Sequence, residues 1–206
     1  MSVPIVVVHG FLGSGKSTFG NFVIEEHGLT RNKFAQTLKN MIRVLLRDAG
    51  VSNRNIERYV EGTTEEKATP IPELRGVTGR HLMETLGENW RDLVYTSLWV
   101  DINDARIERL IENPSINGIL IDDLRYEHEI ESLKAKYGER SSCKVVFVKI
   151  KGSNYEQQMK AREDGTFSGT KGEMGIPDHH FDVVVENKGT LEDLRRQALD
   201  LVERLW

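Results

Sequence analysis

The sequence predicts an α/β fold in which helices cover both faces of a parallel sheet. The first observation is a set of short apolar runs, rich in β-branched residues, at Ile5–Val8, Gly118–Ile121, Val145–Ile150 and Val183–Val185. Such runs are typical of strands buried on both faces, since they do not alternate strictly with polar residues. The second observation is that longer stretches with helical spacing separate the runs. Strands that alternate with helices form a parallel sheet.

Helices are predicted directly after the first run and at the C-terminus. The first helix follows a glycine-rich turn and extends to about Glu26. The last is expected to be capped by Thr190, with Asp193 three residues further on. It is indicated by one apolar stripe whose members are three or four residues apart, namely Leu191, Leu194, Ala198, Leu201 and Leu205.

Two polar stretches interrupt this alternation. Glu61–Thr78 contains Pro70 and Pro72 and is predicted to be a loop. Residues 152–180 are rich in glycine and charge, and they are predicted to form a mobile excursion. Because strands of one sheet lie on both sides of these stretches, neither is a domain linker. We therefore expect a single domain over residues 1–206.

Composition excludes several classes of protein. Lys and Arg total 28 and Asp and Glu total 32, so the net charge of −4 leaves no broad basic surface for nucleic acid or an anionic membrane. Cys143 is the only cysteine, which excludes an internal disulfide and a cysteine-built zinc site. No apolar run approaches the roughly 20 residues that span a bilayer, and the N-terminus shows no secretory signal. A cytoplasmic protein without a membrane partner or a stable nucleic-acid partner is expected.

The strongest local motif is a glycine-rich loop behind the first predicted strand. Residues 10–17, GFLGSGKS, match the P-loop pattern G-x-x-x-x-G-K-[ST] in full. Lys16 is expected to bridge the β- and γ-phosphates of a nucleoside triphosphate, and the Ser17 hydroxyl to hold Mg²⁺. A turn that only connects strand to helix is the alternative, but strand, motif and helix stand in the required order. The residues expected to contact the nucleotide are Gly10, Gly13, Ser14, Gly15, Lys16, Ser17 and Thr18.

A P-loop alone does not separate kinases from GTPase switches or nucleotide-driven motors. Guanine-specific switches carry Asn-Lys-x-Asp after a late strand, whereas Asn187-Lys188-Gly189 is followed here by Thr190. No Asp-x-x-Gly switch follows Asp122, and the chain lacks the length or the basic groove of a DNA-dependent motor. These absences favour a kinase.

Two adjacent acids and an arginine follow the second apolar run. Asp122 and Asp123 stand at the carboxyl end of a predicted buried strand, where open α/β sheets bind ligands. One of the carboxylates can hold magnesium or take a proton from the acceptor, although acids at such a junction also form turns. Arg125 suits bidentate contact with a phosphate, with a solvated surface position as the alternative.

Residues 79–91 carry two sets of side chains with helical spacing. One set is apolar and could simply be core: Leu82, Met83, Leu86 and Trp90. Arg80, Glu84 and Glu88 are four residues apart on another face, where they form either a solvated stripe or part of a site.

Further motifs recur in a fixed order along the chain. They are Phe34-Ala35 with Leu38-Lys39, Arg80-x-Leu-Met-Glu84-x-Leu86-Gly87, Trp99, Asp123-Leu124-Arg125-Tyr126 with His128-Glu129, Glu173 before Pro177, and residues 182–194. In these motifs and the P-loop, over nearly its whole length, the chain resembles the bacteriophage-type deoxynucleoside monophosphate kinases. The resemblance implies a P-loop NTPase fold with a five-stranded parallel sheet, a helical acceptor-nucleotide-binding insertion at about residues 31–105, and a lid at about residues 152–180.

The resemblance also implies a reaction and a set of site residues. The γ-phosphate of ATP would be transferred to a deoxynucleoside 5′-monophosphate with Mg²⁺, in the cytoplasm of a phage-infected host. The implied catalytic residues are Lys16, Asp123 and Arg125, with Ser17 and Asp123 on the metal, directly or through water. The residues implied to bind the acceptor are Lys39, Arg80, Glu84, Gly87, Glu88, Trp90, Trp99, Arg125 and Glu129. Asn187, Lys188 and Gly189 would lie against the adenine, and Lys160 and Arg162 resemble lid cations.

The chain departs from the family pattern in three places. Glu84 stands where glutamine is common, Glu88 where threonine is common, and Thr170 where a histidine precedes the lid glutamate. The first two departures leave the accepted base open, because a carboxylate only accepts hydrogen bonds where an amide also donates them.

Other functions and the oligomeric state also stay open. The alternatives are a kinase of another small acceptor such as dephospho-coenzyme A, a kinase of a modified base in DNA, and a non-enzymatic P-loop regulator. The expected partners are small-molecule nucleotides, with a homodimer as one option.

Overall fold

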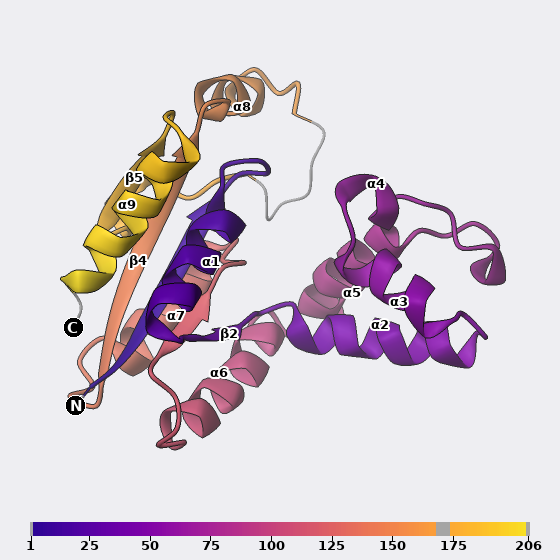
Figure 1. Cartoon of the computed structure of the whole chain (residues 1–206). Coiled ribbons are helices and arrows are strands. Elements are labelled where there is room, and N and C mark those ends of the chain that lie inside the picture. Colours follow the sequence, from indigo (N-terminus) through magenta and orange to yellow (C-terminus); the bar gives the residue numbers. More distant parts are fainter. Residues whose placement is uncertain (1, 168–173, 205–206) are drawn as a thin grey trace. The chain divides into compact units, whose positions relative to one another are not determined.

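The computed structural model describes residues 2–167 and 174–204 (Figure 1). Its contacts divide the chain into two compact units. The sheet unit consists of Met1–Lys33 and Asn103–Trp206, and the helical unit is Phe34–Ile102. The helical unit lies within residues 31–105, the range in which an acceptor-binding insertion is expected.

The sheet unit is built on five strands, each parallel to its neighbours. In spatial order they are β2 (Thr30–Asn32), β3 (Ile119–Ile121), β1 (Val3–Gly10), β4 (Cys143–Gly152) and β5 (Val183–Asn187). The predicted parallel sheet is therefore confirmed, and its four apolar runs are β1, β3, β4 and β5. β2 escapes the hydrophobic pattern because it is a three-residue edge strand, Thr-Arg-Asn, with polar side chains.

Helices of the sheet unit cover both faces of this sheet. They are α1 (Lys16–His27), α7 (Glu127–Tyr137) and α9 (Leu191–Glu203). The unit also contains α8 (Tyr155–Glu163) and a 3₁₀ turn, η3, at Asp178–His180. Val146 and Val148 of β4 belong to a core cluster with residues of α1 and α9. Phe147, which points to the other face because strand side chains alternate, lies under the ammonium group of Lys134 in α7.

The predicted cap of the last helix is confirmed, and its predicted stripe is partly wrong. The Thr190 hydroxyl accepts a hydrogen bond from the Asp193 N–H at 3.2 Å, and the Asp193 carboxylate accepts one from the Thr190 N–H at 2.9 Å. Leu194, Ala198 and Leu201 are buried. Leu191, however, is 65% exposed at the first residue of the helix. Leu205 lies outside the described residues.

The helical unit forms its own apolar core. Its elements are α2 (Gln36–Asp48), α3 (Asn53–Glu61), α4 (Thr64–Lys67), a 3₁₀ turn, η1 (Pro72–Leu74), and α5 (Gly79–Leu93). It also contains the start of α6 (Leu98–Ile111), which continues into the sheet unit. The core consists of Leu38, Ile42, Leu46, Val51, Ile56, Tyr59, Val60, Ile71, Leu98 and Trp99.

The prediction of a loop at Glu61–Thr78 is wrong, because this stretch contains α4 and η1. A capping box starts α4: the Thr63 hydroxyl accepts from the Glu66 N–H, and the Glu66 carboxylate accepts from the Thr63 N–H. These two hydrogen bonds allow a one-turn helix in a stretch too polar to show an apolar stripe. Residues 152–180, the expected lid, contain α8 and η3. None of the helices among the described residues is long and apolar enough to cross a membrane.

Candidate phosphate-binding site

The glycine-rich motif forms a tight loop between β1 and α1. Gly13 and Gly15 have φ angles of +75° and +92°, a region that favours glycine. The Ser14 N–H donates to the Phe11 carbonyl at 3.1 Å and closes the turn. A side chain at Gly15 would also collide with Asn187. The backbone of the motif therefore has the curled conformation that phosphate binding requires.

The loop presents polar groups that suit an anion. The N-cap residue of α1 is Gly15, which has no side chain that could cap the helix, and the first turn of α1 contains no acid. The Ser14 hydroxyl oxygen is buried and has no hydrogen-bond partner among the described residues. Lys16, the first residue of the helix, donates from Nζ to the Phe11 carbonyl at 3.3 Å. A phosphate oxygen fits this arrangement, since it would accept from uncapped N–H groups and from Lys16.

The side chain of Asn187 joins the end of β5 to the P-loop. Its Nδ2 donates to the Ser14 carbonyl at 2.9 Å, across 173 residues of sequence. Lys188, by contrast, pairs with Glu186 at 2.9 Å. Of the three residues expected near the adenine, Asn187 is thus the one that supports the phosphate loop directly.

Helix α8, from the expected lid, contacts the P-loop through an aromatic residue. Phe11 stacks on Tyr155 with ring centroids 5.3 Å apart, and the Arg162 guanidinium lies 3.8 Å from its ring centroid. Gln158 also donates to the Leu12 carbonyl at 3.2 Å. Arg162, an expected lid cation, is here positioned by Phe11. The expectations for Thr170 and Glu173 lie outside the described residues.

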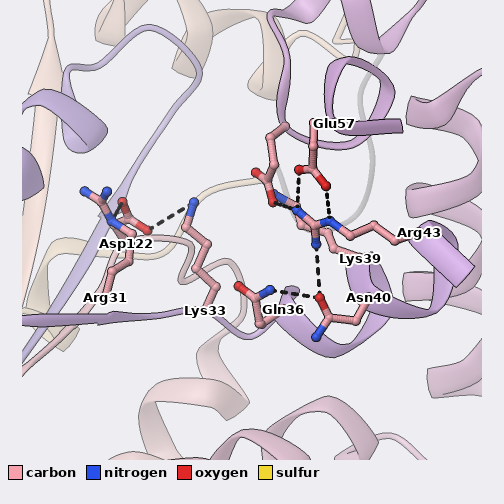
Figure 2. Close-up of polar contacts among 9 residues, drawn as sticks. Arg31, Lys33, Gln36, Lys39, Asn40, Arg43, Glu57 and Asp122 are labelled. Atoms are coloured by element: carbon pink, nitrogen blue, oxygen red, sulfur yellow. Dashed lines mark hydrogen bonds and ion pairs between the residues drawn. The ribbon is translucent and has the colours of Figure 1, made fainter. Parts of the chain in front are cut away.

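The two acids after β3 occupy different environments. Asp122 is 4% exposed, and its Oδ2 lies 3.1 Å from Nε of Arg31 (Figure 2). Asp123 is half-buried. Burial and the charge of Arg109 lower the pKa of Arg106, and the charge of Asp123 opposes this shift. Arg125 is exposed two residues later. Asp123 and Arg125 are thus more exposed to solvent than Asp122.

Glu129, which the resemblance implies to bind the acceptor, holds a backbone turn in the structure. It is buried, and its Oε2 accepts hydrogen bonds from the N–H groups of Arg125 at 2.8 Å and Tyr126 at 3.1 Å. The carboxylate therefore holds the turn that carries Arg125, which is a structural reason for an acid at this position.

Helix α5 carries most of the residues expected to bind the acceptor. Arg80 and Glu84, four residues apart, form an ion pair with an Nε–Oε1 distance of 3.9 Å, and both are about two-fifths exposed. Glu88 lies one turn further on, and its Oε1 is buried without a hydrogen-bond partner among the described residues. The Gly87 carbonyl accepts from Nε1 of Trp99 at 3.0 Å.

The two tryptophans of the helical unit stack on one another. Their ring centroids are 5.9 Å apart, with an angle of 17° between the planes. Trp99 is 1% exposed and belongs to the core, whereas Trp90 is 38% exposed. Trp99, which the resemblance implies to line the acceptor nucleoside, thus has almost no surface exposed to solvent. Trp90, which helical spacing alone could assign to the core, has the accessible ring.

Lys39 belongs to an ion-pair network between α2 and α3 (Figure 2). Its Nζ lies 2.6 Å from Oε2 of Glu61. Arg43 binds Glu57 through two hydrogen bonds of 2.8 and 3.0 Å and also reaches Glu61 at 2.9 Å. The hydrogen bonds from Arg43 hold the pKa of Glu57 below its usual value. Lys39 is therefore already neutralised by Glu61.

Within each unit the structure brings part of the expected site together. In the sheet unit the P-loop and Asn187 meet, and Asp123 and Arg125 share one turn. In the helical unit Arg80, Glu84, Glu88, Gly87 and the tryptophans gather on α5 and the start of α6. Sequence reasoning missed Arg31, Lys33 and the Phe11 contacts, because their partners lie far away in the sequence. Phe11, which lies inside the motif, was the sequence feature that could have indicated an aromatic contact.

No protein-family model matches the chain. A protein of Acanthamoeba polyphaga mimivirus with the provisional name deoxynucleotide monophosphate kinase is 24% identical over 139 residues, covering 63% of this chain and 68% of that protein. The solved structure of dephospho-CoA kinase from Campylobacter jejuni is similar with a TM-score of 0.50 at 11% identity, covering 100% of this chain and 98% of that one. This likeness agrees with the fold described above, a parallel five-stranded α/β fold of the P-loop type.

Proposed function

We propose that this protein is an ATP-dependent kinase that phosphorylates a deoxynucleoside 5′-monophosphate. The observation that carries the proposal is the P-loop, with its two left-handed glycines, an uncapped helix N-terminus and Lys16 at the start of that helix. Backbone N–H groups and a lysine in this arrangement suit the β- and γ-phosphates of a nucleoside triphosphate. The absence of a guanine-reading Asn-Lys-x-Asp favours ATP as the donor.

The choice of acceptor rests on the helical unit and on two comparisons. Arg80, Glu84 and Glu88 follow one another along α5, which combines a cation for a phosphate with acids for a base. The order of motifs resembles the deoxynucleoside monophosphate kinases, and the mimivirus protein carries that provisional name. These observations support a deoxynucleoside monophosphate over other small acceptors.

In the proposed reaction an oxygen of the acceptor phosphate forms a bond to the γ-phosphorus, and the bond from that phosphorus to the β,γ-bridging oxygen breaks. The acceptor phosphate is largely dianionic at neutral pH, since its second pKa is about 6, so it needs no strong general base. Catalysis then depends on positioning and on charge neutralisation. Lys16 would bind the β- and γ-phosphates, and Arg125 would stabilise charge on the transferred group.

The residues present also fit a magnesium ion. Ser17 supplies an exposed hydroxyl and Asp123 a half-buried carboxylate, and Mg²⁺ binds such oxygen ligands together with substrate phosphates. When bound, the ion would neutralise charge on the β- and γ-phosphates. Asp123 would hold it directly or through water.

The proposal is tested by incubating the protein with ATP, Mg²⁺ and one acceptor at a time, with products identified by mass. The panel contains the common and modified deoxynucleoside monophosphates and dephospho-coenzyme A. We expect a diphosphate from at least one monophosphate, and no product from Lys16→Ala, which removes the cation on the β- and γ-phosphates. Product from dephospho-coenzyme A alone would refute the proposed acceptor. Full activity of folded Lys16→Ala would refute the P-loop role.

A further inference from the structure

The sheet unit contains a pair of cations around a buried acid that the proposed mechanism does not use. Nε of Arg31 lies 3.1 Å from Oδ2 of Asp122, and Nζ of Lys33 lies 3.9 Å from Oδ1 (Figure 2). Arg31 also donates to Oδ1 of Asn21 in α1 at 2.7 Å. The three side chains Arg31, Lys33 and Asp122 are called the β2–β3 cluster.

The β2–β3 cluster lies at the edge of the sheet where ligands bind. Val7 of β1 is paired with Ile121 of β3, which is paired with Asn32 of β2. Lys33 and Asp122 each follow their strand by one residue. Neighbouring strands are about 4.8 Å apart, so the end of β2 is roughly 10 Å from β1. Parallel sheets bind ligands outside the carboxyl ends of their strands.

The cluster also lies against the helix that begins with the P-loop lysine. A side chain at Gly20 of α1 would come within 3.4 Å of the Arg31 guanidinium and 3.7 Å of the Asp122 carboxylate. Gly20 follows Ser17 by three residues, so the two lie about one turn apart on the same side of the helix. Arg31 and Asp122 are therefore about one helical turn from the end of α1 that faces the P-loop.

The charges of the β2–β3 cluster are unequal. The side chains of Arg31 and Lys33 are 32% and 26% exposed, whereas the Asp122 side chain is 3% exposed. The acid is thus inside, and both cations keep a part of their surface in solvent. One carboxylate leaves one positive charge uncompensated within the cluster. The Asp122 Oδ1 has no hydrogen-bond partner among the described residues.

A further cation, Arg106, lies beside the end of β2. Arg106 approaches from the other face of β2, where it donates to Oδ1 of Asn32 at 3.1 Å and to the Lys33 carbonyl at 3.0 Å. Asp123 acts on Arg106, and Arg125 follows in the same turn. The surplus positive charge of the β2–β3 cluster itself, two cations on one carboxylate, suits an anionic ligand.

We propose that Arg31 and Lys33 bind the phosphate of the acceptor, and that Asp122 is the internal counter-ion that holds both side chains while the acceptor is absent. Arginine supplies a planar fork for two phosphate oxygens, and lysine a compact charge. The dianion competes with Asp122 for the cations because it carries more charge than one carboxylate. The identity of the acceptor rests on the proposed function, whereas the anion site rests on the β2–β3 cluster itself.

The first test is the acceptor dependence of turnover in Arg31→Gln and Lys33→Gln. Each variant is expected to raise the KM for the monophosphate roughly tenfold or more, with the KM for ATP nearly unchanged, since one charge-assisted contact is lost. Matched controls are Arg140→Gln and Lys136→Gln, whose side chains pair with Glu108 and Asp104 in the same unit. Equal changes in both KM values, or the same acceptor effect in the controls, would overturn the proposal.

The second test is the affinity of Asp122→Asn for an anion, which is expected to change in the opposite direction from the affinity of the two cation variants. Affinity for 2-deoxyribose 5-phosphate is measured by calorimetry without ATP or metal, in a Lys16→Ala background that disables the P-loop lysine. Removal of the counter-ion is expected to tighten binding several-fold, whereas Arg31→Gln and Lys33→Gln weaken it. Unchanged or weaker binding in Asp122→Asn would show an ion cluster that only stabilises the fold, and would overturn the proposal.

The same titration separates the two proposals. If no monophosphate is phosphorylated, the proposed function fails, but 2-deoxyribose 5-phosphate binding that depends on Arg31 and Lys33 still supports the anion site. If turnover occurs and 2-deoxyribose 5-phosphate binds all variants equally, or does not bind at all, the anion site is overturned while the function stands.

Discussion

His9, the residue before the P-loop, is buried with its ring between other aromatic side chains. Its Nδ1 lies 3.0 Å from the Leu124 carbonyl, and its ring stacks on Phe181 with centroids 5.5 Å apart. Burial lowers the pKa of His9 to about 4, and the charges of Lys149, Lys16 and Arg125 act in the same direction. The imidazole is therefore neutral in the folded protein at neutral pH.

His9 should make the folded state less stable in mild acid. The unfolded chain binds a proton at His9 near pH 6.5 while the folded chain does so only near pH 4, so stability falls as the pH falls through this window. The full loss corresponds to roughly 3 kcal/mol. Urea unfolding of wild type and His9→Asn between pH 7 and about 4.5 measures this effect. If the free energy of unfolding changes equally with pH in wild type and His9→Asn, this effect of His9 is contradicted.

The conformation and role of a residue could be predicted from the sequence where they depend on neighbouring residues in the chain. Gly10–Ser17 follow from one contiguous motif, and the structure gives them the expected curled backbone. Glu129 and Trp99 could not be placed in this way. A buried glutamate can cap a turn as well as touch a ligand, and a tryptophan suits a core as well as a base. Only the three-dimensional neighbours distinguish these roles.

At the scale of elements, strand β4 and the turn η3 are joined by a charged clamp. Lys149 of β4 donates to Oδ1 of Asp178 at 2.7 Å, and Lys151 donates to Oδ2 at 2.6 Å. Burial alone would raise the pKa of Asp178, but the hydrogen bonds from both lysines outweigh it and hold the pKa below its usual value. Lys149 is buried, and Asp178 is its charge partner.

Asp178→Asn is therefore expected to destabilise the fold by about 1–3 kcal/mol, since a buried ammonium group loses its counter-ion. The double variant with Lys149→Met should lose less, because the buried charge is removed as well. Asp200→Asn, an exposed acid on α9, is the control. Urea unfolding compares the four proteins. A double variant less stable than Asp178→Asn would count against the clamp.

Helix α5 is expected to determine which base is accepted. Glu84 is partly exposed, and Glu88 has a buried oxygen without a hydrogen-bond partner among the described residues. An ionised carboxylate only accepts hydrogen bonds, so it favours a base that donates, such as one with an exocyclic amine or a hydroxymethyl group. An analogue without the donor leaves the acid unpaired.

Glu84→Gln, Glu88→Thr and the double variant should therefore lower the ratio of kcat/KM between donor-bearing and donor-lacking bases. Because one hydrogen bond to a charged group is involved, we expect roughly a tenfold change or more. Steady-state kinetics on a monophosphate panel measure the ratio, with Glu139→Gln on an exposed loop as the control. A constant ratio in all three variants would mean that these acids do not contact the base.

Elements were predictable where their apolar residues are periodic. Ile5–Val8 lies wholly inside β1, and Leu194, Ala198 and Leu201 lie on the buried side of α9. The elements without an apolar pattern were missed. β2 is a polar edge strand, and α4 depends on the hydrogen bonds of its capping box. Their stability comes from neighbours and caps, which hydrophobic periodicity does not record.

At the scale of the whole molecule, the chain combines a sheet unit that contains the P-loop with a helical unit that has its own core. The sequence allowed the fold class to be predicted, because buried strands alternate with helices. It did not show which distant residues meet. Asn187 contacts Ser14 because β5 ends at the same edge of the sheet as the P-loop. Asp122 contacts Arg31 because β3 lies beside β2.

The most direct test of the proposed function follows the transferred group itself. ATP labelled with heavy oxygen on its γ-phosphate is mixed with the protein, Mg²⁺ and the best monophosphate of the panel, and the products are analysed by mass spectrometry. Direct transfer moves the phosphoryl group with its three oxygens, so the nucleoside diphosphate should carry all three labelled oxygens, and Lys16→Ala should give none. Label found only in inorganic phosphate, with the monophosphate unchanged, would contradict a monophosphate kinase.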